Sequence, residues 1–250
     1  EGANLPLADT EKTGIIGEIR EFCLHDGPGV RTTVFFKGCP LRCPWCHNPE
    51  SKSTATELFY KGELCIACGS CSNVCAVNGH TLTDGVHLFD REKCVRCGKC
   101  VEVCYSNALE ICGEERTAEE VIDIVLHDKP FYEESGGGIT LSGGEPLYQG
   151  EFAVEILKAA KEKGIHTAVD TSGFVGREAI EKVLPYTDLF LYDIKAFSKE
   201  VHEKCTGHTN EIILENLKYI DEMDKKVEIR IPCVPEYNFG ELNAIAEFLK

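Results

Sequence analysis

Five short apolar stretches, rich in β-branched residues, alternate along the chain with segments whose apolar residues recur at helical spacing. The apolar stretches predict strands at Thr32–Phe36, Ile139–Leu141, His166–Asp170, Leu189–Asp193 and Val227–Ile231. The helical spacing predicts helices at Ala118–Leu126, Phe152–Lys163, Arg177–Val183 and Asn210–Met223, and a last helix from Glu241. Alternation of this kind predicts an α/β fold, in which parallel strands and outer helices form a barrel or part of one.

The two ends of the chain add to this pattern. The sequence stops inside or just after a helix, has no initiator Met and offers five barrel strands, as expected of a fragment that lacks a sixth strand. Residues 1–12 are polar and lack the apolar segment of a signal peptide. No apolar run approaches the ~18 residues needed to cross a bilayer, so no membrane-spanning segment is predicted.

Composition and charge narrow the class of protein. The chain has 250 residues, of which 43% are hydrophobic, and this suits one barrel or open-sheet domain plus a small insert. Its formal net charge is −16. Because such a field repels nucleic acid and anionic membranes, we expect neither as a partner.

Eleven of the fifteen cysteines fall into three tight runs. The first run, Cys39-x3-Cys43-x2-Cys46, has no fourth thiol nearby. The other two runs have four thiols each, namely Cys65, Cys68, Cys71 and Cys75, and then Cys94, Cys97, Cys100 and Cys104. Four thiols at this spacing are the bacterial ferredoxin pattern, in which the fourth cysteine of each run ligates the cluster of the other run. A three-thiol set leaves one iron open, so the first run suggests substrate chemistry and the other two suggest electron supply.

The two four-cysteine runs belong to an internal repeat. A shift of 29 residues superposes their cysteines and also places Gly69 on Gly98 and Asn78 on Asn107. A repeat of one small unit predicts two halves packed around a pseudo-two-fold axis. Between the runs, residues 81–88 predict a β-hairpin with its turn at Asp84-Gly85. We place this insert at residues 58–112.

A secreted disulfide scaffold and a set of zinc sites are the alternative explanations for so many cysteines. Disulfide scaffolds are typically short chains with little core, whereas this chain is long, has an odd number of cysteines and keeps them in ligand spacing. Zinc also binds Cys-x2-Cys pairs, but two successive runs of four at this spacing are unusual for zinc. An anaerobic cytoplasm is therefore the predicted location.

Chemically distinctive residues follow the predicted strands. Besides the first cysteine run, they are Ser142-Gly143-Gly144-Glu145-Pro146, Asp170-Thr171, Asp193 with Lys195, and Arg230. Active-site residues of such folds lie at the carboxyl ends of the strands, so we expect these side chains to form one site.

Several of these residues also have a purely structural explanation. Gly-Gly-Glu-Pro is more often a turn than a ligand site, but glycines permit close approach of a ligand, and a carboxylate beside them accepts hydrogen bonds from an ammonium. Asp170 and Asp193 repel one another unless a cation or basic side chain lies between them, and Lys195 could form a structural ion pair with Asp193. Arg230 is expected to face an anion. Trp45 either packs beside a purine or shields a cluster.

The first cysteine run resembles that of the radical S-adenosylmethionine (SAM) superfamily, because Asp26-Gly27-Pro28-Gly29-x-Arg31 precedes it and Asn48-Pro49-Glu50 follows it. More narrowly, the chain resembles the glycyl radical enzyme activating enzymes, relatives of pyruvate formate-lyase activating enzyme, from about Gly14 to its end. The cysteine-rich insert is similar to that of activases of glycyl radical dehydratases, lyases and decarboxylases. The sequence departs from these patterns at Ala76 and Tyr105, where ferredoxin runs have Pro, and at Ser172, where Asn is common.

The resemblance implies a partial (β/α)6 radical SAM barrel at residues 14–57 and 113–250, with a ferredoxin-like α+β insert at residues 58–112. The insert is implied to carry two 4Fe–4S clusters. A third 4Fe–4S cluster is implied on Cys39, Cys43 and Cys46, with its open iron chelated by the amino and carboxylate groups of SAM.

The resemblance also implies which residues contact SAM. Gly143, Gly144 and Glu145 match positions that hold its ammonium, Trp45 matches a position beside the adenine, and Asp193, Lys195 and Arg230 match positions on its ribose and carboxylate side. Asp170, Thr171, Asp193 and the backbone of Ile194 match a monovalent-cation site described for the family.

The implied function is activation of a partner enzyme. Electrons from a flavodoxin or a ferredoxin-type donor enter through the insert clusters, SAM is reductively cleaved, and the 5′-deoxyadenosyl radical generates a glycyl radical on the partner. Two alternatives stay open: a radical SAM enzyme that acts on another substrate, and a non-catalytic polyferredoxin electron carrier. The barrel pattern and the Gly-Gly-Glu-Pro turn weigh against the carrier.

Overall fold

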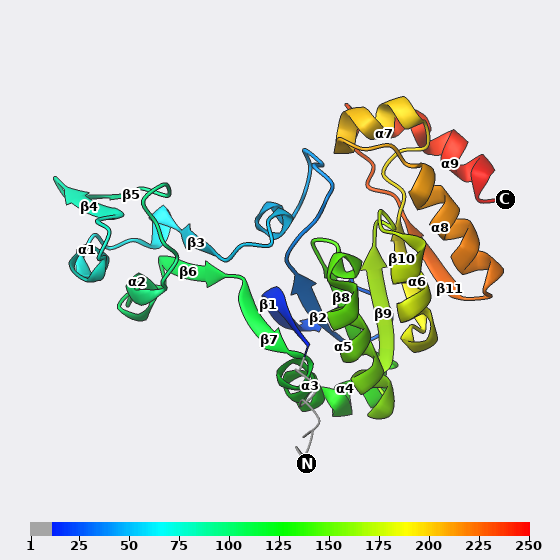
Figure 1. Ribbon diagram of the computed structural model, residues 1–250, viewed down its shortest axis with the longest axis horizontal. Helices are drawn as coiled ribbons and strands as arrows, with labels where there is room; N and C mark the ends of the chain where they lie inside the picture. Colours follow the sequence, from blue (N-terminus) through cyan, green and yellow to red (C-terminus); the bar gives the residue numbers. More distant parts are fainter. Residues whose placement is uncertain (1–11) are drawn as a thin grey trace, which may run out of the picture. The chain divides into compact units, whose positions relative to one another are not determined.

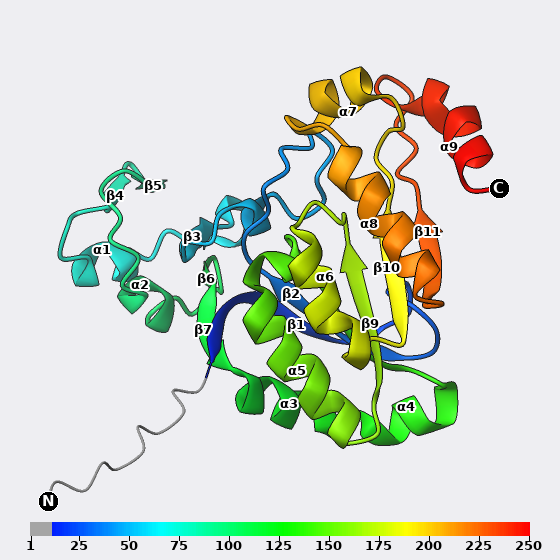
Figure 2. The ribbon, with the colours of Figure 1, turned by 45° about the vertical axis from the view of Figure 1, so that its right-hand side comes forward.

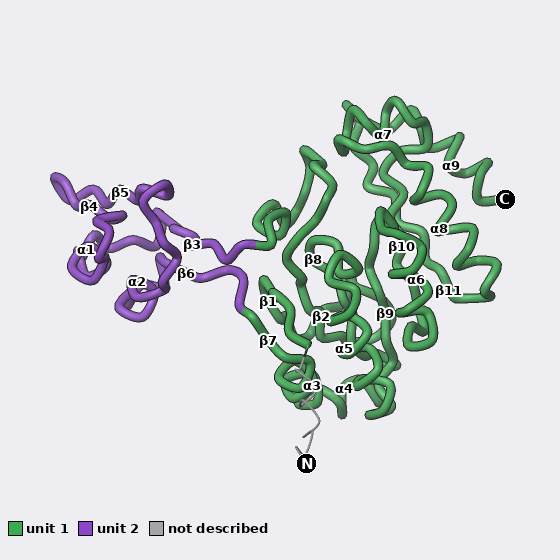
Figure 3. Tube along the Cα trace, in the orientation of Figure 1, with its two compact units in different colours: residues 1–54, 115–250 green, residues 55–114 purple. Residues whose placement is uncertain are grey.

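The computed structural model describes residues 12–250 and has two compact units (Figure 3). One unit contains the chain up to residue 54 together with residues 115–250, and the other contains residues 55–114. The expectation about a signal peptide concerns residues 1–12, of which all but Lys12 lie outside the described residues. None of the helices in the described part of the chain is long and apolar enough to cross a membrane.

A seven-stranded sheet forms the centre of the larger unit (Figure 1). In order across the sheet, its strands are β11 (Lys226–Arg230), β10 (Leu189–Asp193), β9 (His166–Thr171), β8 (Gly138–Gly143), β2 (Arg31–Phe36), β1 (Thr13–Cys23) and β7 (Glu114–Thr117). The five strands from β11 to β2 are parallel, and β1 runs antiparallel to β2. The carboxyl ends of the five parallel strands therefore meet at one edge of the sheet.

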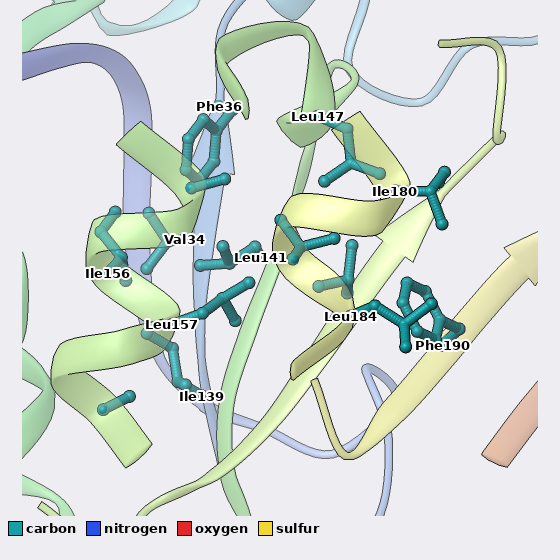
Figure 4. Close-up of a cluster of buried hydrophobic side chains, with 14 of the residues drawn as sticks. Val34, Phe36, Ile139, Leu141, Leu147, Ile156, Leu157, Ile180, Leu184 and Phe190 are labelled. Carbon is teal, nitrogen blue, oxygen red and sulfur yellow. The ribbon is translucent and has the colours of Figure 1, made fainter. Parts of the chain in front are cut away.

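Helices α5 (Gly150–Glu162), α6 (Arg177–Val183) and α8 (Glu211–Glu222) lie along one face of these strands (Figure 2). The other helices of this unit are α3 (Ala118–His127), α4 (Lys129–Ser135), α7 (Lys199–Thr206) and α9 (Leu242–Phe248), with 3₁₀ turns at Pro49–Lys52, Pro146–Gln149, Leu184–Tyr186 and Phe239–Glu241. Ile156 and Leu157 of α5 join Val34, Leu141 and Phe190 of the strands in one buried cluster (Figure 4). Each such side chain contributes about 1.5–3 kcal/mol when buried, so this cluster fixes the sheet against its helices.

The smaller unit is built from two similar halves. Its strands β3 (Glu57–Tyr60) and β6 (Leu109–Cys112) are antiparallel, its short helices are α1 (Ser70–Val74) and α2 (Lys99–Glu102), and a 3₁₀ turn covers Gly62–Leu64. The backbone follows the 29-residue repeat, because Gly69 and Gly98 have φ of 78° and 75°, and Asn78 and Asn107 have φ of 51° and 53°.

The predicted hairpin of the smaller unit is confirmed. Strands β4 (His80–Thr83) and β5 (Val86–Phe89) pair antiparallel. The two residues between them, Asp84 and Gly85, both have positive φ, at 50° and 76°. This is the conformation that a two-residue turn between right-twisted strands requires, and Asp-Gly adopts it readily.

The predicted parallel strands are confirmed, each to within two residues, and the helix Arg177–Val183 has the predicted bounds. The predictions missed β1, β7, α4 and α7 of the larger unit, as well as β3, β6, α1 and α2 of the smaller unit. Strand β1 was missed because residues 18–23 do not alternate regularly between apolar and polar, and four of these six residues are exposed. The result is a mixed α/β fold with a central, largely parallel sheet.

Candidate active site

One cavity of about 270 Å³ lies at the carboxyl ends of the parallel strands in the larger unit. Most of the residues predicted to form the site line it, namely Cys39, Cys43, Trp45, Cys46, Gly143, Gly144, Asp170, Asp193 and Lys195. Glu145 and Arg230 are not among the lining residues. Ser142, Thr171 and Ser172 also line it, although only the first two belong to strand ends singled out from the sequence.

The first cysteine run occupies the loop that follows β2. Backbone hydrogen bonds tie this loop to the turn at residues 49–52: Gly38 N donates to Ser51 O (2.7 Å) and Cys39 N donates to Lys52 O (3.1 Å). The Lys52 ammonium donates to Cys43 O at 3.1 Å. The loop therefore has a fixed course before any ligand binds.

The donor set of this loop fits an iron–sulfur cluster with one open iron. Cys39, Cys43 and Cys46 are free thiols that line the same cavity, and no fourth cysteine is found among its described lining residues. Burial, reinforced by Glu145, raises the pKa of Cys39 to about 12, and burial also raises the pKa of Cys43. Thiols bind metal as thiolates, so the metal itself has to stabilise the deprotonated form here.

Two glycines let the loop after β8 approach the cysteine loop. Gly143 has φ of +103°, and a Cβ there would lie 2.4 Å from Phe36 N. A Cβ on Gly144 would lie 2.5 Å from Gly38 O. Because neither glycine has a Cβ, Gly144 N can donate to Phe36 O and Glu145 N can donate to Gly38 O, both at 2.8 Å. The Gly-Gly pair is therefore required for close backbone packing between the two loops.

Glu145 is fully buried and binds protein groups. Its carboxylate accepts hydrogen bonds from Thr171 Oγ1 (2.7 Å) and from Ser172 N and Oγ (2.9 and 2.7 Å), as well as a longer one from Leu147 N (3.3 Å). Burial raises the pKa of Glu145, while the hydrogen bonds from Ser172 and Thr171 oppose that shift. Glu145 is therefore held against the end of β9, and it is not among the residues that line the cavity.

The two strand-end carboxylates lie next to two basic side chains. Lys195 Nζ is 2.8 Å from Asp193 Oδ2, and Arg230 Nη1 is 3.9 Å from Asp170 Oδ2. Arg230 also donates to His25 O (2.8 Å) outside the lining of the cavity. Burial disfavours the charged form of Lys195, but Asp193, Cys43 and Asp170 together outweigh it and raise the pKa of Lys195. The ion pair between Lys195 and Asp193, which was the structural explanation for these residues, is therefore present, and both residues line the cavity.

Trp45 has a partner that sequence reasoning missed. Its ring lies 5.1 Å from the ring of Tyr237, tilted by 58°. Tyr237 lies in the irregular segment between β11 and α9, where no periodic pattern marks it. Ser172 was noted only as a departure from the family pattern, yet it supplies two of the hydrogen bonds to Glu145.

Asp170→Asn is expected to change how stability depends on pH. Burial and the Asp193 carboxylate raise the pKa of Asp170 from 3.8 to about 7. Folding therefore favours the protonated carboxyl, and the free energy of unfolding falls as pH rises between these two values. Because asparagine resembles the neutral carboxyl, its advantage over the wild type should grow by about 2–3 kcal/mol between pH 5 and pH 8. Anaerobic urea unfolding at both pH values measures this, and an equal pH dependence of the two proteins would contradict it.

The eight cysteines of the two four-cysteine runs form two mixed sets. One cavity is lined by Cys65, Cys68, Cys71 and Cys104, and a second by Cys75, Cys94, Cys97 and Cys100. Each set combines three cysteines of one run with the fourth cysteine of the other. This crossed arrangement is the one that two-cluster ferredoxins use, and all eight thiols are free.

Comparison with known proteins identifies the class. Residues 33–249 match the sequence profile of the radical SAM superfamily, so the chain belongs to that superfamily. Its curated relatives at 40–45% identity are activating enzymes of glycyl radical enzymes, and this chain is an activating enzyme of the same family.

Two relatives show the extent of the similarity. The choline trimethylamine-lyase activating enzyme of Oleidesulfovibrio alaskensis is 45% identical over 96% of this chain and 79% of the relative. The trans-4-hydroxy-L-proline dehydratase activating enzyme of Clostridioides difficile is 44% identical over 94% of this chain and 80% of the relative. Among solved structures, a domain of pyruvate-formate lyase-activating enzyme from Bacteroides vulgatus is 37% identical, with a TM-score of 0.43 over 45% of this chain and 71% of that one.

Proposed function

We propose that Cys39, Cys43 and Cys46 hold a 4Fe–4S cluster whose open iron is completed by the amino and carboxylate groups of SAM. The observation that supports this best is the presence of all three thiols on one cavity wall, together with the glycine pair and the acidic strand ends. When bound, the cluster would supply one electron to the sulfonium of SAM, whose C–S bond would break to give methionine and a 5′-deoxyadenosyl radical. That radical would take a hydrogen atom from a glycine of the partner enzyme and leave 5′-deoxyadenosine and a glycyl radical.

The residues of this chain then have the tasks of binding, aligning and shielding, since hydrogen-atom transfer needs no protein acid or base. We assign Trp45 to the adenine side of SAM, and Gly143 and Gly144 to close backbone approach to its ammonium. Glu145 acts through Thr171 and Ser172, to which it is hydrogen bonded.

The charged strand ends receive the other parts of SAM in this proposal. Asp193, Lys195 and Arg230 meet its ribose and carboxylate side. The carboxylates of Asp170 and Asp193, with Thr171 and the backbone of Ile194, form a monovalent-cation site. Burial and the nearby Asp193 carboxylate raise the pKa of Asp170, and a bound cation there would offset the repulsion between the two carboxylates.

The remaining assignments concern the domains. We assign residues 14–57 and 113–250 to a partial (β/α)6 radical SAM barrel, supported by the five adjacent parallel strands. Residues 58–112 are assigned to a ferredoxin-like insert with two 4Fe–4S clusters, supported by the crossed cysteine sets. In this proposal the insert receives electrons from a flavodoxin or ferredoxin-type donor in an anaerobic cytoplasm.

The proposed partner is a glycyl radical enzyme, and sequence identity to the relatives does not favour one partner reaction over another. Relatives that are 45%, 44% and 44% identical to this chain are named for choline trimethylamine-lyase, trans-4-hydroxy-L-proline dehydratase and isethionate sulfite-lyase. Specificity of this kind belongs to the contact surface with the partner rather than to the SAM site.

Electron paramagnetic resonance (EPR) of candidate partners tests the proposed function. Each candidate is incubated anaerobically with this protein, SAM and a reductant, and we expect a glycyl radical signal on one of them that requires all three. SAM cleavage without a radical on any glycyl radical enzyme would indicate another substrate. Reversible reduction with no SAM cleavage would indicate an electron carrier, and either outcome would contradict the proposal.

A further inference from the structure

Two buried histidines of the hairpin β4–β5 lie between the two crossed cysteine sets of the smaller unit. His87 lines the cavity that contains Cys65, Cys68, Cys71 and Cys104, whereas His80 lines the cavity of the other set. Their exposed fractions are 7% and 4%. Neither side chain has a role in the function proposed above, and burying two imidazoles between thiol sites requires a reason.

The two rings lie within hydrogen-bonding distance of each other, and one of them also contacts a cysteine set. His80 Nδ1 and His87 Nε2 are 3.0 Å apart. His87 Nδ1 is 3.7 Å from Cys65 Sγ, and His87 Nε2 is 3.5 Å from Cys71 Sγ. The contacts with sulfur are therefore confined to His87, and His80 reaches that cysteine set only through His87.

Aromatic neighbours hold both imidazoles in these positions. The ring of Phe89 stacks on His80 with centroids 4.8 Å apart, and Tyr60 meets His87 edge-on at 4.5 Å. The Tyr60 hydroxyl also donates to His87 O at 3.4 Å. Since the rings are fixed by packing, their hydrogen-bonding directions are fixed too.

The acceptors around His87 select one tautomer of the neutral pair. An iron-bound thiolate accepts hydrogen bonds and cannot donate them. A proton on His87 Nδ1 gives two hydrogen bonds, one from Nδ1 to the Cys65 sulfur and one from His80 Nδ1 to His87 Nε2. A single proton on His87 Nε2 is shared between His80 Nδ1 at 3.0 Å and the Cys71 sulfur at 3.5 Å, and it leaves the Nδ1 lone pair facing the Cys65 sulfur.

We propose that His87 donates a hydrogen bond to the Cys65 thiolate and thereby raises the reduction potential of the cluster held by Cys65, Cys68, Cys71 and Cys104. A donor withdraws electron density from the ligand sulfur and so favours the reduced cluster. His80 is a positioning residue that keeps His87 in the donating tautomer. The role of His87 depends on the proposed two-cluster insert. It adds an asymmetry between two otherwise repeated halves, because the 29-residue repeat places the apolar Leu58 at the position that corresponds to His87.

The test is an EPR-monitored redox titration of the full-length protein carrying Cys43→Ala, so that the insert clusters alone contribute. We expect His87→Phe to move one of the two midpoint potentials to a more negative value and to leave the other unchanged. His80→Phe should move the same potential in the same direction by a smaller amount. If both potentials stay in place, or both move equally, the tuning role of His87 is wrong.

A second pair of variants keeps the test decisive if His87→Phe loses a cluster. The side-chain nitrogen of His87→Asn takes the place of Nδ1, whereas His87→Leu has a similar shape and no donor. We expect a near-wild-type potential with asparagine and a lowered one with leucine, and equal potentials in the two variants would overturn the assignment of the donor.

Metal analysis separates this inference from the proposed function. Cys71, His80 and His87 offer ligand atoms within 4.8 Å of one another and could hold zinc instead. Zinc in place of iron and sulfide in the wild-type insert would refute the two-cluster proposal and the tuning together. Iron and sulfide for two clusters, with potentials insensitive to His87, would refute the tuning alone.

Discussion

Cys43→Ala is expected to abolish SAM cleavage while the insert clusters remain assembled. Cys43 is one of three thiols on the wall of the cavity, and the thiols of the insert form two separate sets. Two thiols cannot hold a cluster that already lacks a fourth protein ligand, so iron should fall from about twelve to about eight atoms per chain. Iron and sulfide analysis, together with chromatography of the 5′-deoxyadenosine formed, measures both effects.

Cys205→Ala is the matched control for this variant. Cys205 is also a buried free thiol of the larger unit, but it lies in α7 and does not line the cavity. We expect it to keep the full iron content and wild-type cleavage. Cleavage at the wild-type rate by Cys43→Ala would refute the assignment of the site cluster.

Glu145→Ala is expected to lower both stability and SAM affinity. The substitution leaves the buried Ser172 N–H without its acceptor at 2.9 Å, and it removes the acceptor of the Thr171 and Ser172 hydroxyls. An unsatisfied buried donor costs about 1–3 kcal/mol, and the loss of the buried side chain adds to that cost. Thr171 and Ser172 line the cavity, so their displacement is expected to weaken SAM binding. A loss of about 1.4 kcal/mol of binding free energy corresponds to a tenfold weaker affinity.

Urea unfolding and equilibrium binding of SAM to the anaerobic protein measure these two effects. Glu151→Ala is the control, since Glu151 is exposed and forms ion pairs with Lys12 and Lys182 at the surface. We expect little change there, because exposed ion pairs contribute little. Unchanged SAM affinity in a Glu145→Ala protein of lowered stability would mean that Glu145 supports the fold without positioning the site.

Much of the fold could be predicted because the parallel strands are buried and continuous. Val34, Leu141 and Phe190 lie in short apolar runs whose flanking helices have clear periodicity. Strand β7 could not be predicted in the same way, since Glu114–Thr117 is polar and only its pairing in the sheet makes it a strand. Exposed edge elements carry little of the hydrophobic pattern on which such predictions depend.

The site was predictable where ligand chemistry constrains spacing. Cysteines that share a cluster must recur at fixed intervals, and strand-end residues such as Asp193 are placed by topology alone. The role of Glu145 was not predictable, because its burial follows from packing against Thr171 and Ser172. His87 was read only as a hairpin residue and His80 was not singled out, because nothing in their spacing shows that their rings meet.

The most direct test of the central claim is the EPR spectrum of the reduced wild-type protein, recorded anaerobically before and after addition of SAM. We expect the signal of one cluster to change on addition of SAM, while the signals of the other two stay as they were, and we expect no change in Cys43→Ala. If all iron sites are coordinated by thiolates and SAM leaves the spectrum unaltered, the claim that one iron is left open to bind SAM is wrong.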